Sequence, residues 1–273
     1  MRAIALRPAV VAPRASRGRV LLWLAVVLGG ALALLFWMPA AWLTGVVGSA
    51  TGGRLVLDEP RGTVWSGSAR LLLTGGEGSR DAAALPGRVE WVLRPVWLGA
   101  ALDVRLPCCS GNAVQVTALH DWDATQVTVG PAQLRLPMGL LTGLGTPWNT
   151  VQLQGVLAID TAGMDVRWQQ RQLAPRGEVR MEATDVASRL STLRPLGSYR
   201  MALAAPGGNA SPTLQLDTLA GSSLLLSGRG EWAGGRLRFT GEASAVPGRE
   251  AALANLLNII GRRNGPRSII TVG

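Results

Sequence analysis

The feature that most constrains this chain is an uninterrupted apolar run, Val20 to Trp37, which has no charged or strongly polar side chain. At about 1.5 Å per residue, a helix over this run spans roughly 27 Å, close to the hydrocarbon thickness of a bilayer. Trp23, Trp37 and Trp42 lie near its ends, where indole rings favour the headgroup region. The run therefore predicts a transmembrane anchor over residues 20–38.

The charges on the two sides of the run predict its orientation. The only charged residues before the run are arginines, whereas the first charged residue after it is Arg54. By the positive-inside rule, residues 1–19 form a basic cytoplasmic tail, and a linker over residues 39–53 and a body over residues 54–273 are exported, in a bacterium to the periplasm. The tail arginines are Arg2, Arg7, Arg14, Arg17 and Arg19.

Two other interpretations of the run stay open. A cleaved signal peptide has a positive start and an apolar core, but that core is usually about 7–15 residues and ends in an A-x-A-like site. Here the run is longer, and Met38-Pro39-Ala40-Ala41 matches such a site poorly. The other interpretation is a buried helix of a soluble protein. Only this last one leaves the body in the cytoplasm.

The net charge does not indicate nucleic-acid binding. Removing the five tail arginines from the formal net charge of +10 leaves +5 for the rest of the chain. The remaining arginines are scattered, whereas a phosphate-binding surface needs a cluster or stripe of them. Nucleic acid is therefore excluded as an expected partner.

The two cysteines, Cys108 and Cys109, are adjacent in the sequence. Neighbouring cysteines can be bridged only in a strained vicinal form, so the fold does not depend on an ordinary disulfide. They also lack the second C-x-x-C pair of a zinc site. We expect a buried or turn-located pair of small apolar side chains and no metal.

Short segments that alternate apolar and polar residues, separated by Gly and Pro, fill the chain beyond residue 53. This pattern is typical of antiparallel β-structure with tight turns. The sequence predicts a mainly β body, a twisted, elongated antiparallel sheet with one or two short helices. The expected strands are Arg54–Leu57, Gly67–Leu73, Arg88–Leu93, Ala100–Leu106, Ala113–Ala118, Gln126–Val129, Gln133–Leu136, Val151–Ile159, Met164–Gln169, Glu178–Thr184, Arg200–Ala204, Thr213–Leu216, Ser222–Ser227 and Arg236–Ala243.

Gly and Pro also mark where these strands are expected to end. Turns are predicted over residues 59–62, 161–163 and 175–177. A strand break is predicted at Arg94-Pro95, because proline cannot donate to a central ladder. The apolar, Gly-rich segment Leu136–Thr146 is expected to be a short helical or irregular crossover.

Two helices are expected in the body. Asp185–Leu193 is a short candidate. Ala251–Ile260 is better supported, because Leu253, Leu256, Leu257 and Ile260 recur at i, i+3, i+4 and i+7 and line one face.

The chain is poorly supplied with catalytic groups. His120 is the only histidine, and flanking Asp121 and Asp123 are weak support for a metal or acid–base site, so an exposed turn is the simpler interpretation. Gly62 and Gly67 have the spacing of a phosphate loop, but the required lysine is absent. No G-x-S-x-G or H-E-x-x-H motif occurs. We therefore expect a non-catalytic protein without a cofactor.

Several motifs along the body resemble one family. They are GTVWSGSA at 62–69, WVLRP at 91–95, GRGEW at 228–232, LRFTGEA at 237–243, LANLLNIIGRR at 253–263 and SIIT at 268–271. In this order, after the anchor, they resemble protein N of the bacterial type II secretion system, the general secretion pathway, over nearly the whole chain.

The resemblance implies a bitopic inner-membrane protein that is an accessory part of the machine carrying folded proteins across the outer membrane. It implies partners among the other secretion subunits of the inner-membrane platform, and neither a cofactor nor catalytic residues. The strand-rich body is also similar to AsmA-like lipid-handling proteins. The alternative is therefore a lipid-binding or lipid-transfer module, whose partner is membrane lipid. Oligomeric state is not predicted.

A few residues are candidates for structural or partner contacts. Gly62, Trp65, Gly67 and Trp232 belong to two similar turns, GTVWSG and GEWAGG. Most tryptophans are expected to pack on the open face of the sheet. Arg262 and Arg263 follow the second predicted helix; they could reach carboxylates of a partner or lipid phosphates, but the simpler interpretation is that they stabilise the helix C-terminus.

Overall fold

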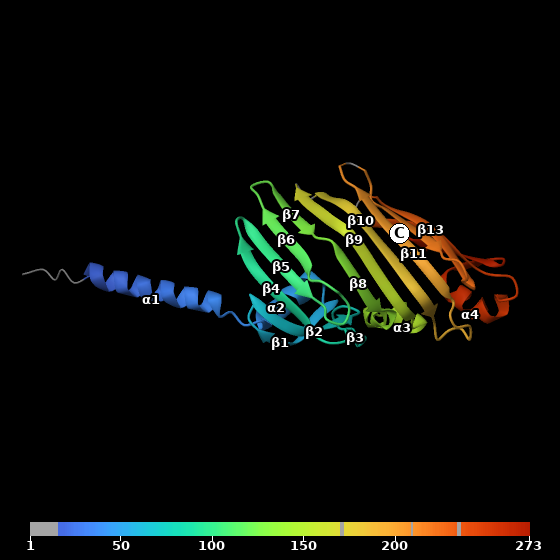
Figure 1. Cartoon of the computed structure of the whole chain (residues 1–273), viewed down its shortest axis with the longest axis horizontal. Helices are drawn as coiled ribbons and strands as arrows, with labels where there is room; N and C mark the ends of the chain where they lie inside the picture. Colours follow the sequence, from blue (N-terminus) through green and yellow to red (C-terminus); the bar gives the residue numbers. More distant parts are fainter. Residues whose placement is uncertain (1–15, 170–171, 209, 234–235) are drawn as a thin grey trace, which may run out of the picture. The chain divides into compact units, whose positions relative to one another are not determined.

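The computed structural model of the chain describes residues 16–169, 172–208, 210–233 and 236–273 (Figure 1). The chain divides into two compact units, Met1–Met38 and Pro39–Gly273. Most of the predicted cytoplasmic tail, residues 1–15, lies outside the described residues.

The described part of the first unit contains helix α1, Ser16–Phe36. Its Leu and Ala residues favour a helix and it contains no proline. The predicted helix is thus confirmed. Among the described residues, however, no helix has both the length and the hydropathy that crossing a membrane requires. The crossing itself stays a prediction.

The second unit, which we call the body, is built on one antiparallel sheet of 16 strands, and this confirms the predicted mainly β fold. The strands are β1 Leu55–Gly62, β2 Ser66–Thr74, β3 Ala82–Ala84, β4 Val89–Val96, β5 Gly99–Arg105, β6 Val114–His120, β7 Ala124–Val129, β8 Ala132–Pro137, β9 Gln154–Gln169, β10 Gln172–Ala187, β11 Gly197–Pro206, β12 Thr213–Thr218, β13 Leu224–Ala233, β14 Arg236–Ala245, β15 Arg262–Asn264 and β16 Arg267–Val272.

The strands follow chain order across most of the sheet. Strand β2 branches to pair with both β3 and β4, and β9 branches to pair with β7 over one half and β8 over the other. At the far edge β16 pairs with β14, and β15 lies outermost. The short helices of the body are α2 Ala41–Ala50, the 3-10 helix η1 Met138–Leu144, α3 Trp148–Val151 and α4 Glu250–Ile260.

Alternation gives the sheet one apolar and one polar face. Across β9 to β12 the paired residues Ile159, Met181, Met201 and Leu216 share the apolar face. Their sequence neighbours face the other side, where Arg180, Ala202 and Gln215 are paired in the same way. The period of two in the sequence therefore sets which face is covered.

Helices cover the apolar face near one end of the strands. Leu253, Leu256 and Leu257 of α4 are at most 2% exposed and pack with Leu224 and Ala243. This confirms the predicted helix and its apolar stripe. Separate clusters join η1 to β2 through β5, η1 to β10 and β11, and the start of α2 to Trp91. In Figure 1, α3 and α4 lie beside the lower ends of the strands.

We call the opposite ends of the strands, together with the turns that join them there, the rim. The turns over residues 63–65, 97–98 and 121–123 lie on it, and so do the paired strand ends Gln169 and Gln172. In the described part of the chain, none of the four hydrophobic clusters includes a residue of β6 or β7. The apolar face of these strands is therefore left half-buried near the rim.

The two predictions based on proline were wrong. Residues 59–62 were expected to form a turn, but β1 continues through them with an irregular register between Asp58 and Arg61. Pro60 is tolerated because β1 is an edge strand. Strand β4 likewise continues through Pro95 to Val96. On the β2 side, the last hydrogen bond to β4 runs from the Leu93 N–H to the Trp65 carbonyl at 2.7 Å, so Pro95 lies where no described strand needs its missing N–H.

The predicted turns at 161–163 and 175–177 were also wrong, because both segments lie inside the long strands β9 and β10. Ala162 is the extra residue of a bulge, since Thr161 pairs with Val179 and Gly163 with Glu178. A bulge uses the same residue types as a turn but keeps the chain extended.

The expected helix over Asp185–Leu193 was wrong as well. Strand β10 runs to Ala187, and Ser188 then turns the chain, its hydroxyl donating to the Val151 carbonyl at 2.5 Å. The expected crossover at Leu136–Thr146 is confirmed as η1.

Candidate interaction surface

The GTVWSG motif forms the turn between β1 and β2. Gly62 has a φ of +87°, and a Cβ there would lie 2.5 Å from the Ser66 carbonyl oxygen. A Cβ on Gly67 would lie 2.6 Å from Cζ2 of Trp91, whose indole N–H donates to the Val64 carbonyl at 3.1 Å. Both glycines therefore have a packing role: they let the turn close over a buried tryptophan.

The candidate contact residues do not form one site. Gly62, Trp65 and Gly67 lie by the first edge of the sheet, whereas Trp232 is in β13 and pairs with Leu237. Trp65 and Trp232 are both half-buried at the rim, but most of the sheet separates them.

Arg262 and Arg263 are exposed in the edge strand β15. They were expected to stabilise the C-terminus of the preceding helix, but α4 ends at Ile260 with Gly261 extended and no basic residue in its last turn. They pair instead with Ile269 and Ser268 of β16. Short, charged strands of this kind protect a sheet edge from further pairing.

Two of the three anchor residues, Val20 and Trp23, lie on α1, and Trp37 directly follows it. The side chain of Val20 is outside the described residues, while Trp23 is 71% exposed and Trp37, just beyond the helix, is 81% exposed.

The structure brings together a surface that the sequence did not predict. The tryptophans were expected to pack on the sheet, and Trp91 does so at 5% exposed. Trp97 and Trp122, by contrast, are 89% and 96% exposed at the tips of two hairpins. With their exposed neighbours they form what we call the tryptophan rim: Trp97, Leu98, Leu119, Trp122, Trp168 and Leu173.

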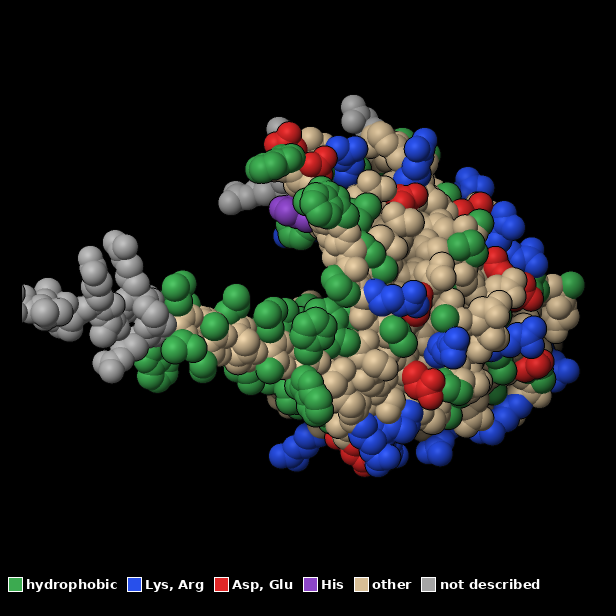
Figure 2. All heavy atoms as spheres, turned by 60° about the vertical axis from the view of Figure 1, so that its left-hand side comes forward, with side chains coloured by type: hydrophobic (Ala, Val, Ile, Leu, Met, Phe, Trp, Pro, Cys, Tyr) green, Lys and Arg blue, Asp and Glu red, His purple; other side chains and the backbone are tan. Residues whose placement is uncertain are grey.

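Strand pairing places these six side chains on adjacent hairpins. The His120 N–H donates to the Leu98 carbonyl at 2.8 Å, which joins the first two tips. Thr125 pairs with Trp168, and Trp168 with Leu173, which extends the row to the β9–β10 hairpin. Figure 2 shows hydrophobic side chains next to the only histidine and next to acidic groups on this part of the surface.

His120 lies at the end of β6, exposed, with Nδ1 2.9 Å from Oγ1 of Thr125. Asp121 accepts the backbone N–H of Trp122 at 2.8 Å and shapes the tip. In the part of the chain that the structure describes, no group of three His, Cys, Asp or Glu side chains could hold a metal ion.

One comparison decides which family the chain belongs to. The family model for type II secretion system protein N matches residues 53–271. The chain belongs to this family. The match covers nearly the whole body and confirms the predicted resemblance. No curated protein and no solved structure matches the chain.

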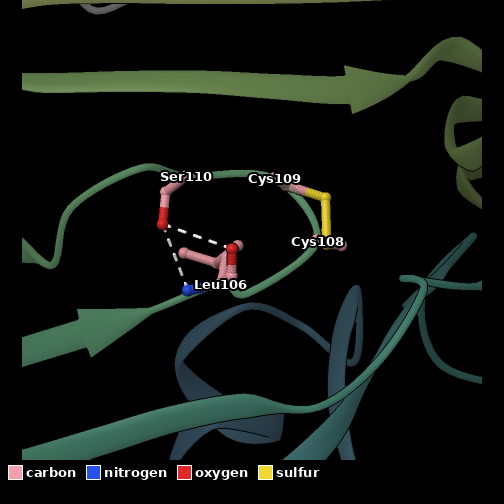
Figure 3. Close-up of a disulfide and its surroundings, with 4 residues drawn as sticks. All are labelled: Leu106, Cys108, Cys109 and Ser110. Carbon is pink, nitrogen blue, oxygen red and sulfur yellow. Dashed lines mark hydrogen bonds between the residues drawn. A yellow bond between two sulfur atoms is a disulfide. The ribbon is translucent and has the colours of Figure 1, made fainter.

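As a member of the protein N family, the chain is a component of the type II secretion system, which is located in the cell envelope, and its partners include other subunits of that system. The two cysteines lie in a turn of the protein N body (Figure 3). Cys108 and Cys109 are joined by a disulfide, and the Ser110 hydroxyl bonds to the Leu106 backbone. The predicted turn location is confirmed.

This cysteine turn also pairs with strand β8 of the protein N body. The Arg135 N–H donates to the Cys109 carbonyl at 2.7 Å, and Ser110 forms a bridge with Leu134. The turn therefore pairs with the side of β8 that would otherwise be an open edge.

The polar face of the protein N body carries paired charges. A shallow hollow of about 890 Å³ there is lined by side chains that include Arg180, Glu182 and Arg200. Arg200 pairs with Glu182 at 3.5 Å. Arg180 pairs with Glu178 at 2.7 Å, and this hydrogen bond and the charge of Glu178 raise the pKa of the guanidinium. Solvated pairs of this kind fit a structural role better than a reaction site.

Proposed function

We propose that the chain is a non-catalytic accessory component of the type II secretion system, anchored in the bacterial inner membrane with its body in the periplasm. By contacting other subunits of the inner-membrane platform, it supports export of folded proteins across the outer membrane. The observation that carries this proposal is the family match over residues 53–271.

The N-terminal sequence supports the anchored topology. The run from residue 20 to residue 38 is helical through Phe36 and uncharged, and five arginines precede it. Such asymmetry keeps the basic end in the cytoplasm. Residues 39–53, which include α2, then link the anchor to the sheet.

The surfaces support a contact role. His120 bonds to Thr125, and Asp121 accepts a hydrogen bond from the backbone N–H of Trp122. Among the described residues, no group of three His, Cys, Asp or Glu side chains could hold a metal ion. Exposed aromatic side chains, by contrast, are typical of interaction surfaces.

Secretion by a bacterium that encodes this chain tests the proposal. Deleting the gene is expected to trap secreted enzymes in the periplasm or to weaken assembly of the inner-membrane platform, and the full chain supplied from a plasmid is expected to restore both. A His120→Ala chain is expected to restore them equally well. Normal secretion and normal assembly after deletion would refute the secretion role, whereas failure of His120→Ala alone would indicate catalysis.

A lipid-binding module is the second candidate, and one observation favours it. On the apolar face of β6, β7 and β9, Val116, Val127, Val129 and Val166 are half-buried, and no hydrophobic cluster of the described residues includes them. An uncovered apolar strip across β6, β7 and β9 is the surface that an acyl chain would use.

Lipid carrying a photoactivatable group at the end of its acyl chain tests this candidate. In vesicles containing the full chain, adducts are expected on peptides 114–120 and 124–129. A Val127→Ser/Val166→Ser chain is expected to lose most of them, and a Gln126→Ser chain, altered on the opposite face, to keep them. Adducts confined to residues 20–38 would exclude an acyl-binding face.

A further inference from the structure

We propose that the tryptophan rim is a second membrane contact, which rests Trp97 and Trp122 in the headgroup layer of the bilayer that holds the anchor. This inference depends on the proposed anchoring and adds to it a surface of the body that touches lipid.

The exposure of the two tips needs an explanation. Trp97 and Trp122 are 89% and 96% exposed, although a large apolar ring is normally buried when the fold permits it. Leu98, beside Trp97, has a φ of +60°, a costly conformation for a residue other than glycine. The first hairpin thus holds two apolar side chains outward in a strained turn.

The tips belong to a row of exposed apolar side chains along the rim. Leu98 is hydrogen-bonded to the β6–β7 hairpin through the His120 N–H, and that hairpin pairs with Trp168 through Thr125. Leu119, Trp168 and Leu173 are 41%, 57% and 65% exposed. Trp168 and Leu173 pair on the apolar face, whereas Leu119 pairs with Gln126 and lies on the other face. Three neighbouring hairpins therefore present exposed indole and leucine side chains along one rim, which is more than a scatter of single apolar residues.

The point where the chain enters the body identifies lipid as the occupant. Pro39, the first residue of the body, forms a bridge with Thr63, and the Ala40 N–H donates to the Gly62 carbonyl at 3.0 Å. The same turn bonds to β4, four residues before Trp97. The entry point and the tips thus lie on the same rim of the body. If the residues before Pro39 end in a bilayer, its surface is within reach of this rim.

Helix α2 extends the apolar surface at the entry point. It has no charged residue, and Leu43 packs towards Trp91 while Trp42 and Val46, one turn apart, are 65% and 62% exposed on the outer side. A helix that is apolar on both sides is unusual on a water-exposed surface, and indoles favour the bilayer interface.

The charges at the second tip determine how deeply Trp122 enters the bilayer and which lipid headgroups favour its contact. Asp121 and Asp123 flank Trp122 and are exposed. Carboxylates disfavour the hydrocarbon core and anionic headgroups, but the ammonium group of a zwitterionic headgroup complements them. Trp122 therefore enters only to headgroup depth, and anionic lipid weakens the contact of this tip.

Photo-crosslinking of the full chain in phosphatidylcholine vesicles tests the proposal, with a photoactivatable group placed next to the lipid headgroup. Adducts are expected on peptides 92–99 and 119–125, several-fold more than on peptide 147–153, which carries Trp148 at the opposite edge of the sheet. Replacing part of the phosphatidylcholine with phosphatidylglycerol is expected to reduce the adducts on peptide 119–125.

Matched variants separate the rim from general effects. Trp97→Ser/Trp122→Ser is expected to remove most adducts from peptides 92–99 and 119–125 without changing the circular dichroism spectrum, because both side chains are exposed. Trp148→Ser, which replaces a 39% exposed tryptophan away from the rim, is expected to leave them unchanged.

Three outcomes would overturn the inference. Equal adducts at the rim and at 147–153 would show no preferred contact. Absence of rim adducts in a chain that resists alkaline extraction would refute the rim contact alone. A chain that alkali extracts would refute the anchoring as well.

Discussion

At the scale of single residues, the sequence motif that pointed to the family turns out to be a packing device. Gly62 and Gly67 let a tight turn close against Trp91, which is 5% exposed and hydrogen-bonded to that turn. The motif could be found in the sequence, but its partner could not, because Trp91 reaches it only through the pairing of β2 with β4.

Gly67→Ala is expected to destabilise the body by about 1–3 kcal/mol, because the added Cβ would lie 2.6 Å from both Trp91 Cζ2 and the Arg61 carbonyl oxygen. The shift of the urea unfolding midpoint measures this. Gly111→Ala is the control, since its Cβ would meet nothing within 4 Å. Equal midpoints for the two variants would contradict the packing role.

Tyr199, the only tyrosine, gives the body a pH dependence. Burial raises its pKa, and its hydroxyl donates to the Leu224 carbonyl at 3.0 Å. Because the unfolded chain loses this proton first, near the ordinary value of about 10, the stability from neutral Tyr199 is present below that pH and falls as pH rises above it.

The ultraviolet absorbance of tyrosinate measures this directly, since one residue gives the whole signal. Ionisation is expected only together with unfolding, and Tyr199→Phe is expected to lose this alkaline slope at a cost of about 1 kcal/mol near neutral pH. Ionisation of the folded chain near pH 10 would show that the hydroxyl is not buried.

At the scale of elements, the strands could be predicted and their ends could not. Alternation located most of them, because a period of two follows directly from a sheet with one covered face. The same residues that make turns, such as Thr161-Ala162-Gly163 and Pro60, also make bulges and edge strands. Which of these occurs depends on the neighbouring strand, and the local sequence does not contain that information.

Helix α4 is the clearest element-scale test, because its apolar spacing predicted both the helix and its buried stripe. Leu257→Ala is expected to cost about 2–5 kcal/mol, since this side chain is 1% exposed in the α4 cluster. Ile259→Ala, at 44% exposed, is expected to cost less than about 0.5 kcal/mol. Urea unfolding of the two variants compares them, and similar costs would mean that α4 does not pack as described.

At the scale of the whole molecule, the resemblance found the family, whereas the tryptophan rim could not be predicted. Trp97, Trp122 and Trp168 are far apart in the sequence and lie on neighbouring hairpins only because β4 to β7 and β9 are neighbours in the sheet. Composition alone favoured packing roles for them. The exposed tips thus became visible only through the pairing of strands.

The secretion role requires the body to lie outside the cytoplasm. Alkaline phosphatase fused after Gly273, which is active only after export, tests this most directly when compared with a green fluorescent protein fusion that fluoresces only in the cytoplasm. We expect high phosphatase activity and no fluorescence, with the activity retained in the membrane fraction. A fluorescent fusion without phosphatase activity would place the body in the cytoplasm and contradict the secretion role.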